Sequence, residues 1–329
     1  MALEGDERRR IAAGPGQPAP GQPVGRTVGP GQSVGPGRAA AAGQSVGPGR
    51  AVGPGRAAGP SGAAAAQLRR RRPSLRLLEE VGDMMLLTGR TIAAALRPPY
   101  PFGGEFVSQF LFTLRAVWFP LLVTTVAINY GAPGLQAANF LTIFGALDRL
   151  GGFFVLAAIR EIGPLITAVV IAGVAGTAIT ADLGARKVRE ELDALQVLGV
   201  DPVKNLVVPR FLALMIATGL FDIYALLFGI FGGILAAVVN GQPLGPFWST
   251  LFANSSVVDL WGSVLKTSMF GAIIAIVCCY KGMSASGGAE GVGRAVNQAV
   301  VISFLGFGAF NYVFTQTLLA THPNILVIK

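Results

Sequence analysis

The sequence predicts an all-α integral membrane protein, with one helix at the membrane surface followed by five membrane-spanning helices. Its composition is 52% hydrophobic and 13% charged, with a mean hydropathy of +0.58, whereas soluble domains carry about 25% charged residues. Five apolar runs are long enough to cross a bilayer, which takes about 20 residues per helix. A short charged segment between the second and third runs should face water.

The N-terminal tail, residues 1–73, differs in composition from the membrane domain expected at 74–329. Residues 1–72 hold 11 Arg against three acidic residues, so this stretch carries +8 of the formal net charge of +9. Gly, Pro, Ala, Gln and Arg dominate residues 11–66, and such a segment has too few large apolar side chains to form a core. We expect a disordered cytoplasmic tail, and its charge does not indicate a nucleic-acid partner.

The surface helix and the spans follow from residue patterns. Ser74–Leu96 mixes apolar and charged residues at helical spacing, so it should lie in the membrane surface. The second span, at about 1.5 Å per residue, would reach about 45 Å, which exceeds a hydrocarbon core of about 30 Å. With Gly163-Pro164 inside it, this helix should be tilted or broken, with Arg160 and Glu161 at the break. The five spans are expected at 106–130, 152–181, 206–239, 257–280 and 296–319.

The orientation follows from the distribution of Lys and Arg, which favour the cytoplasmic side of a membrane. The tail and the segments 182–210 and 281–294 carry nearly all of the basic residues outside the spans, whereas the expected outer loops, 131–149 and 240–257, contain a single Arg. We therefore expect a multi-pass protein of the plasma or inner membrane. Its N-terminus should be cytoplasmic and its C-terminal end, 322–329, outside.

The charged segment 185–210 predicts a helix, a tight turn and a new helix on the cytoplasmic side. Arg189 and Asp193 have the i,i+4 spacing of an ion pair. Gly199 fits a left-handed C-cap, and Asp201-Pro202 fits an N-cap followed by proline at the first helical position. The protein itself, the membrane surface or a partner could cover the apolar stripe of the first helix. The stripe recurs at spacings of four, three and three: Val188, Leu192, Leu195 and Leu198.

Charged residues inside the expected spans allow two interpretations. Arg160 and Glu161 are adjacent and opposite in charge, while Asp222 and Lys266 stand alone in the third and fourth spans. Each charge near the bilayer centre costs about 3 kcal/mol, so such residues usually face the interior of a bundle or a water-filled cavity. They either pin helices together or lie along a transport path. Lys266 could also extend its ammonium group to the interface.

The sequence offers no catalytic, metal-binding or phosphate-binding pattern. The single histidine, His322, has no clustered ligands near it, and Cys278 and Cys279 should pack as small hydrophobes. The glycine-rich stretch 287–293 follows a span instead of a strand and lacks Gly-Lys-Ser/Thr, so we expect a flexible cytoplasmic loop. The chain should be no enzyme and should bind no cofactor itself.

The stretch REIGPLITAVVIAGVAGTAITADLGARKVREELDALQVLGVDPVKNLVVPR, residues 160–210, resembles the MlaE/YrbE permeases. These are the membrane subunits of ABC-type lipid transporters associated with Mce-domain proteins. The resemblance continues through GGIL at Gly232 and GVGRAVNQAVV at 291–301, and it makes 74–329 a permease domain with a tail outside the family pattern. Among actinobacterial members, the intact Asp201-Pro202 and the closing glycine-rich segment resemble the A-type subunit.

This resemblance implies specific partners. Two permeases would lie side by side as a homodimer or heterodimer, with separate ATPase subunits that use ATP and Mg²⁺ beneath them and Mce proteins above. Many relatives have Glu-Gln where this chain has Glu190-Glu191. By the resemblance, Glu190 to Gly199 match the coupling helix that docks into the ATPase. The implied coupling residues are Val188, Glu190, Glu191, Leu192, Asp193, Leu195, Leu198, Gly199, Asp201 and Pro202.

The expected function is therefore that of a permease subunit moving a lipid, such as a fatty acid, phospholipid or sterol, between the membrane and an Mce conduit. One alternative is a non-transporting scaffold that assembles Mce proteins, in which Arg160 and Glu161 serve only packing. Another is an intramembrane enzyme acting on lipid. The lack of a His/Asp/Glu or nucleophile cluster within the spans argues against the enzyme.

Overall fold

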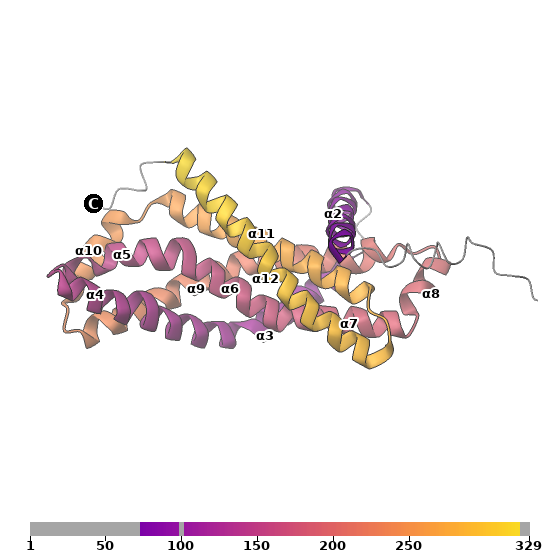
Figure 1. Ribbon diagram of the computed structural model, residues 1–329, viewed down its shortest axis with the longest axis horizontal. Coiled ribbons are helices and arrows are strands. Elements are labelled where there is room, and N and C mark those ends of the chain that lie inside the picture. Colours follow the sequence, from indigo (N-terminus) through magenta and orange to yellow (C-terminus); the bar gives the residue numbers. More distant parts are fainter. Residues whose placement is uncertain (1–72, 99–101, 323–329) are drawn as a thin grey trace, which may run out of the picture. The chain divides into compact units, whose positions relative to one another are not determined.

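The computed structural model describes residues 73–98 and 102–322, and these residues form helices and connecting turns without any strand (Figure 1). The predicted all-α class with five spans is confirmed. The tail expected at 1–73 lies outside the described residues except for Pro73, as does the C-terminal stretch 323–329. Within the described part of the chain, five helical segments are long and apolar enough to cross a membrane: Gly103–Ile143, Leu147–Val188, Val203–Val239, Val257–Met283 and Gly288–Thr321.

Helix α2 (Pro73–Leu96) corresponds to the predicted surface helix. Leu87 and Thr91 are buried on the side that faces the bundle, whereas Leu78 and Met85 are 69% and 70% exposed. Such an exposed apolar face is typical of a helix lying in the membrane surface. Tyr280 Oη donates to Asp83 Oδ2 at 3.3 Å, which fastens α2 to α11 (Val257–Met283).

The first span is longer than predicted. Helix α3 (Gly103–Asn129) continues through a π-helical turn, η1 (Tyr130–Gln136), into α4 (Ala137–Ile143). The prediction of an outer loop at 131–149 is thus wrong for most of its length. The wider π-helical turn accommodates Pro133, and Ala138 is fully buried, so this segment packs as part of the bundle.

The second span was expected to be tilted or broken, and it runs from Leu147 to Val188 without a break. A π-helical segment replaces the break at Arg160 and Glu161, and Gly163 donates its N–H to Ala158 O, five residues earlier. Pro164 then occupies the start of α6, where a missing N–H is tolerated. In order, the span comprises η2 (Leu147–Arg149), α5 (Leu150–Phe154), η3 (Val155–Ile162), α6 (Gly163–Ile171), η4 (Ala172–Gly176) and α7 (Thr177–Val188).

The remaining elements differ from prediction at two places. Helix α10 (Leu244–Asn254) fills the expected second outer loop, because Phe247 and Leu251 are buried against the bundle. Helix α12 (Gly288–Thr321) begins inside the glycine-rich stretch, so the flexible loop predicted at 287–293 is wrong. Gly287 adopts φ +89° and starts that helix from a left-handed conformation. The other elements are α8 (Glu191–Val197), η5 (Val203–Val207) and α9 (Val208–Val239).

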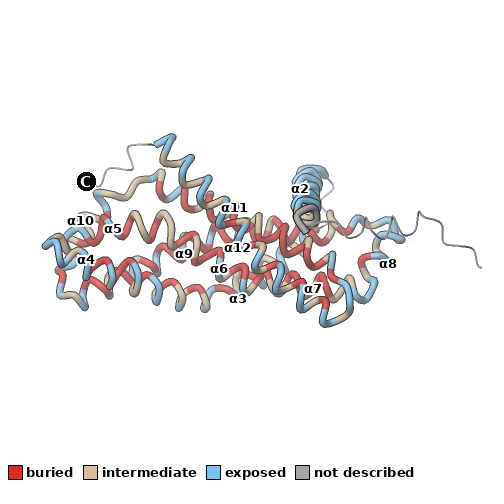
Figure 2. The backbone as a smooth tube through the Cα atoms, in the orientation of Figure 1, coloured by how far each residue is buried: buried red, intermediate tan, exposed pale blue. Residues whose placement is uncertain are grey.

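The core lies where α9 and α11 pack against α3, α6 and α7 (Figure 2). Glycine allows the closest approach of α3 and α9, because a Cβ at Gly232 would lie 2.8 Å from the Val126 carbonyl oxygen. Cys278 and Cys279 are free and fully buried, which confirms that they pack as small hydrophobes. The exposed positions on the spans are largely apolar, as expected for helices that face lipid.

Candidate functional site

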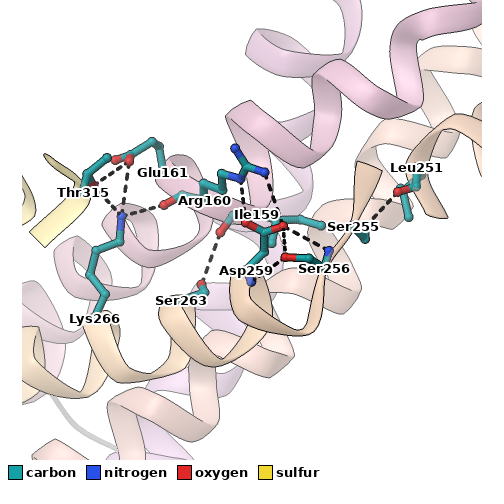
Figure 3. Close-up of polar contacts among 10 residues, drawn as sticks. All are labelled: Ile159, Arg160, Glu161, Leu251, Ser255, Ser256, Asp259, Ser263, Lys266 and Thr315. Atoms are coloured by element: carbon teal, nitrogen blue, oxygen red, sulfur yellow. Dashed lines mark hydrogen bonds and ion pairs between the residues drawn. The ribbon is translucent and has the colours of Figure 1, made fainter. Parts of the chain in front are cut away.

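A cluster of charged and hydroxyl side chains joins η3 to α11 and α12 (Figure 3). Arg160 and Glu161 are neighbours in η3, and their ion-pair partners both come from α11. Arg160 Nε lies 2.7 Å from Asp259 Oδ1, and its Nη2 donates to Oδ2 at 3.3 Å. Glu161 Oε1 lies 3.3 Å from Lys266 Nζ. The adjacent charges therefore hold η3 against two different turns of α11.

Pro164 explains why Lys266 and Ser263 reach the backbone of η3. Proline has no N–H, so it cannot donate to the carbonyl groups four and five residues earlier. Lys266 Nζ donates to the first of these, Arg160 O, at 2.6 Å, and Ser263 Oγ lies 3.2 Å from the second, Ile159 O. Lys266 of α11 thus satisfies one of these backbone oxygens, and the Ser263 hydroxyl lies beside the other (Figure 3).

The cluster extends to α12 and α9. Thr315 Oγ1 donates to Glu161 Oε1 at 2.8 Å, and Asn311 Nδ2 donates to Glu161 Oε2 at 2.9 Å. On the other side, Ser263 Oγ lies 2.7 Å from Asp222 Oδ2. Four helical segments therefore meet through one polar network. Asp222 and Lys266 are not the lone charges that the sequence suggested.

Burial distinguishes the members of this network. The side chains of Asp259, Lys266 and Arg160 are 1%, 4% and 12% exposed, whereas that of Glu161 is 32% exposed. Lys266 points into the bundle, so the interpretation that it extends to the interface is wrong. Glu161 is the most accessible charge of the two ion pairs, and it faces α12.

Four members of the network were missed in the sequence: Asp259, Ser263, Asn311 and Thr315. Asn311 and Thr315 carry no sequence signal of a polar contact within the membrane. Asp259 does, because Ser256 and Asp259 form a capping box at the start of α11, with Asp259 N donating to Ser256 Oγ at 3.1 Å. The Ser-x-x-acid spacing at the start of an apolar run is a readable signal of a helix N-terminus.

The second candidate site is α8, the short helix between the second and third spans. The predicted single helix is wrong, because α7 ends at Val188 and Glu190 has φ +60°, which breaks the chain direction before α8. Lys187 Nζ pairs with Asp193 Oδ1 at 2.8 Å, so Arg189 and Asp193 do not form the expected pair. Instead, Arg189 Nε pairs with Glu191 Oε1 at 2.6 Å, and this contact raises the pKa of Arg189.

The predicted apolar stripe is divided between two sides. Leu192 is 4% exposed and Leu195 packs partly buried against the core, so the protein itself covers this half. Leu198 and Val197 are 76% and 87% exposed, and Val188, at the end of α7, is 40% exposed. The break at Glu190 rotates α8, which is why the stripe does not continue along one face. We call Val197 and Leu198 the exposed apolar edge.

The turn after α8 follows the prediction. Gly199 adopts φ +74°, the left-handed conformation expected of a C-cap. Asp201 Oδ1 accepts a hydrogen bond from Val203 N at 2.9 Å, and Pro202 begins the next helix. A groove of about 470 Å³ lies beside this turn. Its lining includes charged and polar residues of α2, α7 and α8 together with the turn itself: Arg90, Lys187, Asp193, Gln196, Asp201 and Pro202.

A third polar contact lies where α8 joins the bundle and was not predicted. Arg210 was assigned to the water-facing segment, but its side chain is fully buried. Its Nη2 atom lies 2.7 Å from Asp182 Oδ2 and 3.1 Å from Glu105 Oε1. The guanidinium group thus connects α9 to both α7 and α3.

These features exclude some chemistry within the described residues. No group of three or more His, Cys, Asp and Glu among them has the arrangement of a metal site. The polar cluster combines ion pairs with hydroxyl and amide groups in a bundle of five apolar helices. Fold and site together define a multi-pass helical membrane protein with a charged network inside its bundle.

The chain belongs to the MlaE permease family, because the family profile described as Permease MlaE matches residues 106–317. It is 30% identical over 244 residues to a probable ABC transporter permease protein of Rickettsia bellii, covering 74% of this chain and 93% of the relative. A probable ABC transporter permease protein of Synechocystis is 38% identical over 187 residues, 54% of this chain and 68% of its own length.

A third relative carries a more specific name. The intermembrane phospholipid transport system permease protein MlaE of Haemophilus influenzae is 32% identical over 184 residues, which cover 55% of this chain and 70% of that protein. Family membership therefore confirms the resemblance found in the sequence, and this chain is of the ABC transporter permease type.

Proposed function

We propose that this chain is the permease subunit of a transporter that moves a lipid in association with Mce-domain proteins, driven by ATP and Mg²⁺ in a separate ATPase subunit. The observation that carries this proposal is the exposed apolar edge of α8, where Leu198 is 76% exposed. An apolar edge on a short charged helix outside the spans suits a protein partner. Phospholipid is the favoured cargo, because the Haemophilus relative is named for phospholipid transport.

The coupling site comprises α8 and its two flanking turns. In this proposal the ATPase contacts Val188, Val197 and Leu198, while Leu192 and Leu195 hold α8 against the bundle. Asp193 fixes the angle between α7 and α8 through its pair with Lys187, and Gly199, Asp201 and Pro202 fix the turn into the third span. Glu190 and Glu191 lie at the N-terminus of α8, where their negative charges would contact the ATPase.

The polar cluster gives the transport path a charged group inside the membrane. Arg160, Asp259 and Lys266 are nearly buried, so their primary role is to hold η3, α11 and α12 in place. Glu161 is accessible enough to meet a lipid head group, and Asn311 and Thr315 beside it offer further polar contacts. Asp222 anchors the network to α9 through Ser263.

The surrounding assembly and the orientation are also parts of the proposal. The domain 74–329 would work beside a second permease, either identical or paralogous, with α8 and the N-terminus in the cytoplasm and the C-terminus outside. The positive-inside distribution of Lys and Arg supports this orientation in the plasma or inner membrane. The A-type identity within the YrbE group stays a prediction.

A reconstitution experiment tests this function. The complete complex in proteoliposomes should move a labelled phospholipid only with ATP and Mg²⁺, and Leu198→Glu should abolish that movement. A non-transporting scaffold predicts that the wild-type complex assembles with Mce proteins and moves no lipid. An assembled wild-type complex without ATP-dependent lipid movement would therefore overturn the proposal in favour of the scaffold.

A further inference from the structure

The buried guanidinium of Arg210 occupies a mechanical junction between three spans. Its Nη2 atom contacts Asp182 of α7 at 2.7 Å and Glu105 of α3 at 3.1 Å. Its Nη1 atom donates to Leu206 O in η5 at 2.9 Å. The Arg210 side chain is 0% exposed, whereas those of Asp182 and Glu105 are 41% and 33% exposed. A single side chain of α9 thus binds groups from three other helical segments, α3, α7 and η5.

Asp182 and Arg210 flank α8 in the sequence. Asp182 precedes α8 in α7, and Arg210 follows α8 in α9. Their ion pair therefore ties together the two ends of the excursion that carries α8 out of the bundle. A displacement of α8 would therefore act on α7 and α9 together, because this ion pair joins them.

Close packing makes the α7 side of the junction stiff. A Cβ at Gly282 of α11 would lie 2.8 Å from Leu183 Cβ, and one at Gly184 would lie 3.1 Å from Val292 Cγ1 of α12. Helix α7 therefore cannot move toward α11 or α12 without a clash, so these three helices should move as one packed unit. Glu105, by contrast, lies in the first turn of α3, near the end of that span.

Arginine suits this junction better than any other residue. Its planar guanidinium offers five N–H donors in a fixed fork, so it can bind two carboxylates and a carbonyl group at once. A buried charge network is often no more stable than apolar packing of similar volume. Its advantage here is that it fixes the relative positions of three helices.

We propose that Arg210 is a positioning residue that transmits movement of α8 to the first span, α3. This inference rests on the proposed function, in which a separate ATPase moves α8. When the ATPase shifts α8, the tied ends of α7 and α9 move together, and Glu105 carries the beginning of α3 with them. Movement of α3 relative to its neighbouring helices then changes which apolar side chains of the first span are exposed to lipid.

The test uses the complete complex with Arg210→Lys, which keeps the charge and removes the fork. Arg186→Gln is the matched control, since Arg186 pairs with the same Asp182 at 3.2 Å but is 33% exposed. Arg210→Lys should lower the phospholipid moved per ATP hydrolysed several-fold, with ATPase binding unchanged. Arg186→Gln should leave the ratio at the wild-type value.

A structural readout separates transmission from folding. Spin labels at two exposed positions, Val107 in α3 and Ala194 in α8, should change their separation on ATP binding in the wild type and in Arg186→Gln. Arg210→Lys should suppress that change. If Arg210→Lys does not fold, Glu105→Gln replaces it, because this variant keeps the Arg210–Asp182 pair and loses only the charged link to α3.

The outcomes distinguish this inference from the function on which it rests. If a folded Arg210→Lys or Glu105→Gln keeps the wild-type ratio and label movement, the role of Arg210 is overturned. The same holds if Arg186→Gln is equally impaired, or if the wild-type complex moves lipid with no change in label separation. Failure of the wild-type permease to bind any ATPase would overturn the proposed function itself, and the inference with it.

Discussion

The polar cluster around Arg160 and the segment around α8 differ in which of their side chains the chain itself covers. In the cluster, charges lie within spans, and partners from the same chain satisfy them: Asp259 for Arg160, and Lys266 for Glu161. At α8, charged residues surround an apolar edge that the chain leaves exposed. The difference teaches that the first region is largely complete in one chain, whereas the second leaves an apolar edge that the proposed ATPase would cover.

The largest effect should follow from removing one partner of a buried ion pair in the polar cluster. Asp259→Ala removes the partner of Arg160 and leaves a nearly buried guanidinium without its carboxylate. Such a loss costs about 3–5 kcal/mol in the free energy of unfolding. Thermal and denaturant unfolding in detergent measure it, with Asp148→Ala as the control, because the Asp148 side chain is 60% exposed beside Arg149. Equal stability of the two variants would contradict the claim that Asp259 satisfies the buried charge of Arg160.

A smaller and more local effect is expected at the turn after α8. Gly199→Ala places a Cβ at φ +74°, where the left-handed conformation costs an L-residue about 1–2 kcal/mol. Hydrogen exchange of the α8 amides should speed up while the spans keep their protection. Gly245→Ala is the control, since Gly245 is helical with an ordinary φ and open space around its Cα. Unchanged exchange in α8 would show that the turn does not hold the helix.

The partly exposed member of the cluster should separate stability from transport. Glu161→Gln keeps the shape of the side chain, and its remaining amide oxygen can still accept from Thr315 or Asn311. Lys266 loses its charged partner, but it keeps its bond to Arg160 O and can still donate to the glutamine oxygen. We therefore expect a loss of about 1 kcal/mol in the free energy of unfolding, but a clear loss of phospholipid transfer. Transfer at the wild-type rate by this variant would assign Glu161 to packing alone.

Much of the fold was predictable from sequence because long apolar runs identify spans irrespective of their neighbours. The π-helical segments were not, since glycine and proline at 163–164 signal a disturbed helix without saying whether it breaks or widens. The Arg160–Asp259 pair joins residues 99 positions apart, and only the packing of η3 on α11 brings them together.

The same reasoning explains the errors near α8. The spacing of Val188, Leu192, Leu195 and Leu198 correctly identified apolar residues in a helical register, but spacing cannot show that Glu190 interrupts the register. Arg210 was placed with the water-facing charges because it follows a charged segment. Its burial depends on Asp182 and Glu105, which come from two other helices.

The smallest expected effect on stability accompanies the most direct test of the account. Leu198→Glu alters an exposed side chain, so the free energy of unfolding should change by no more than about 0.5 kcal/mol. Gln196→Glu is the matched control, because it adds the same charge to α8 without removing an apolar contact.

Co-purification of the ATPase with each folded permease variant is the decisive measurement. The account predicts that the ATPase is lost with Leu198→Glu and retained with Gln196→Glu. Recovery of the ATPase at the wild-type ratio with folded Leu198→Glu would contradict the claim that the exposed apolar edge of α8 is its docking surface.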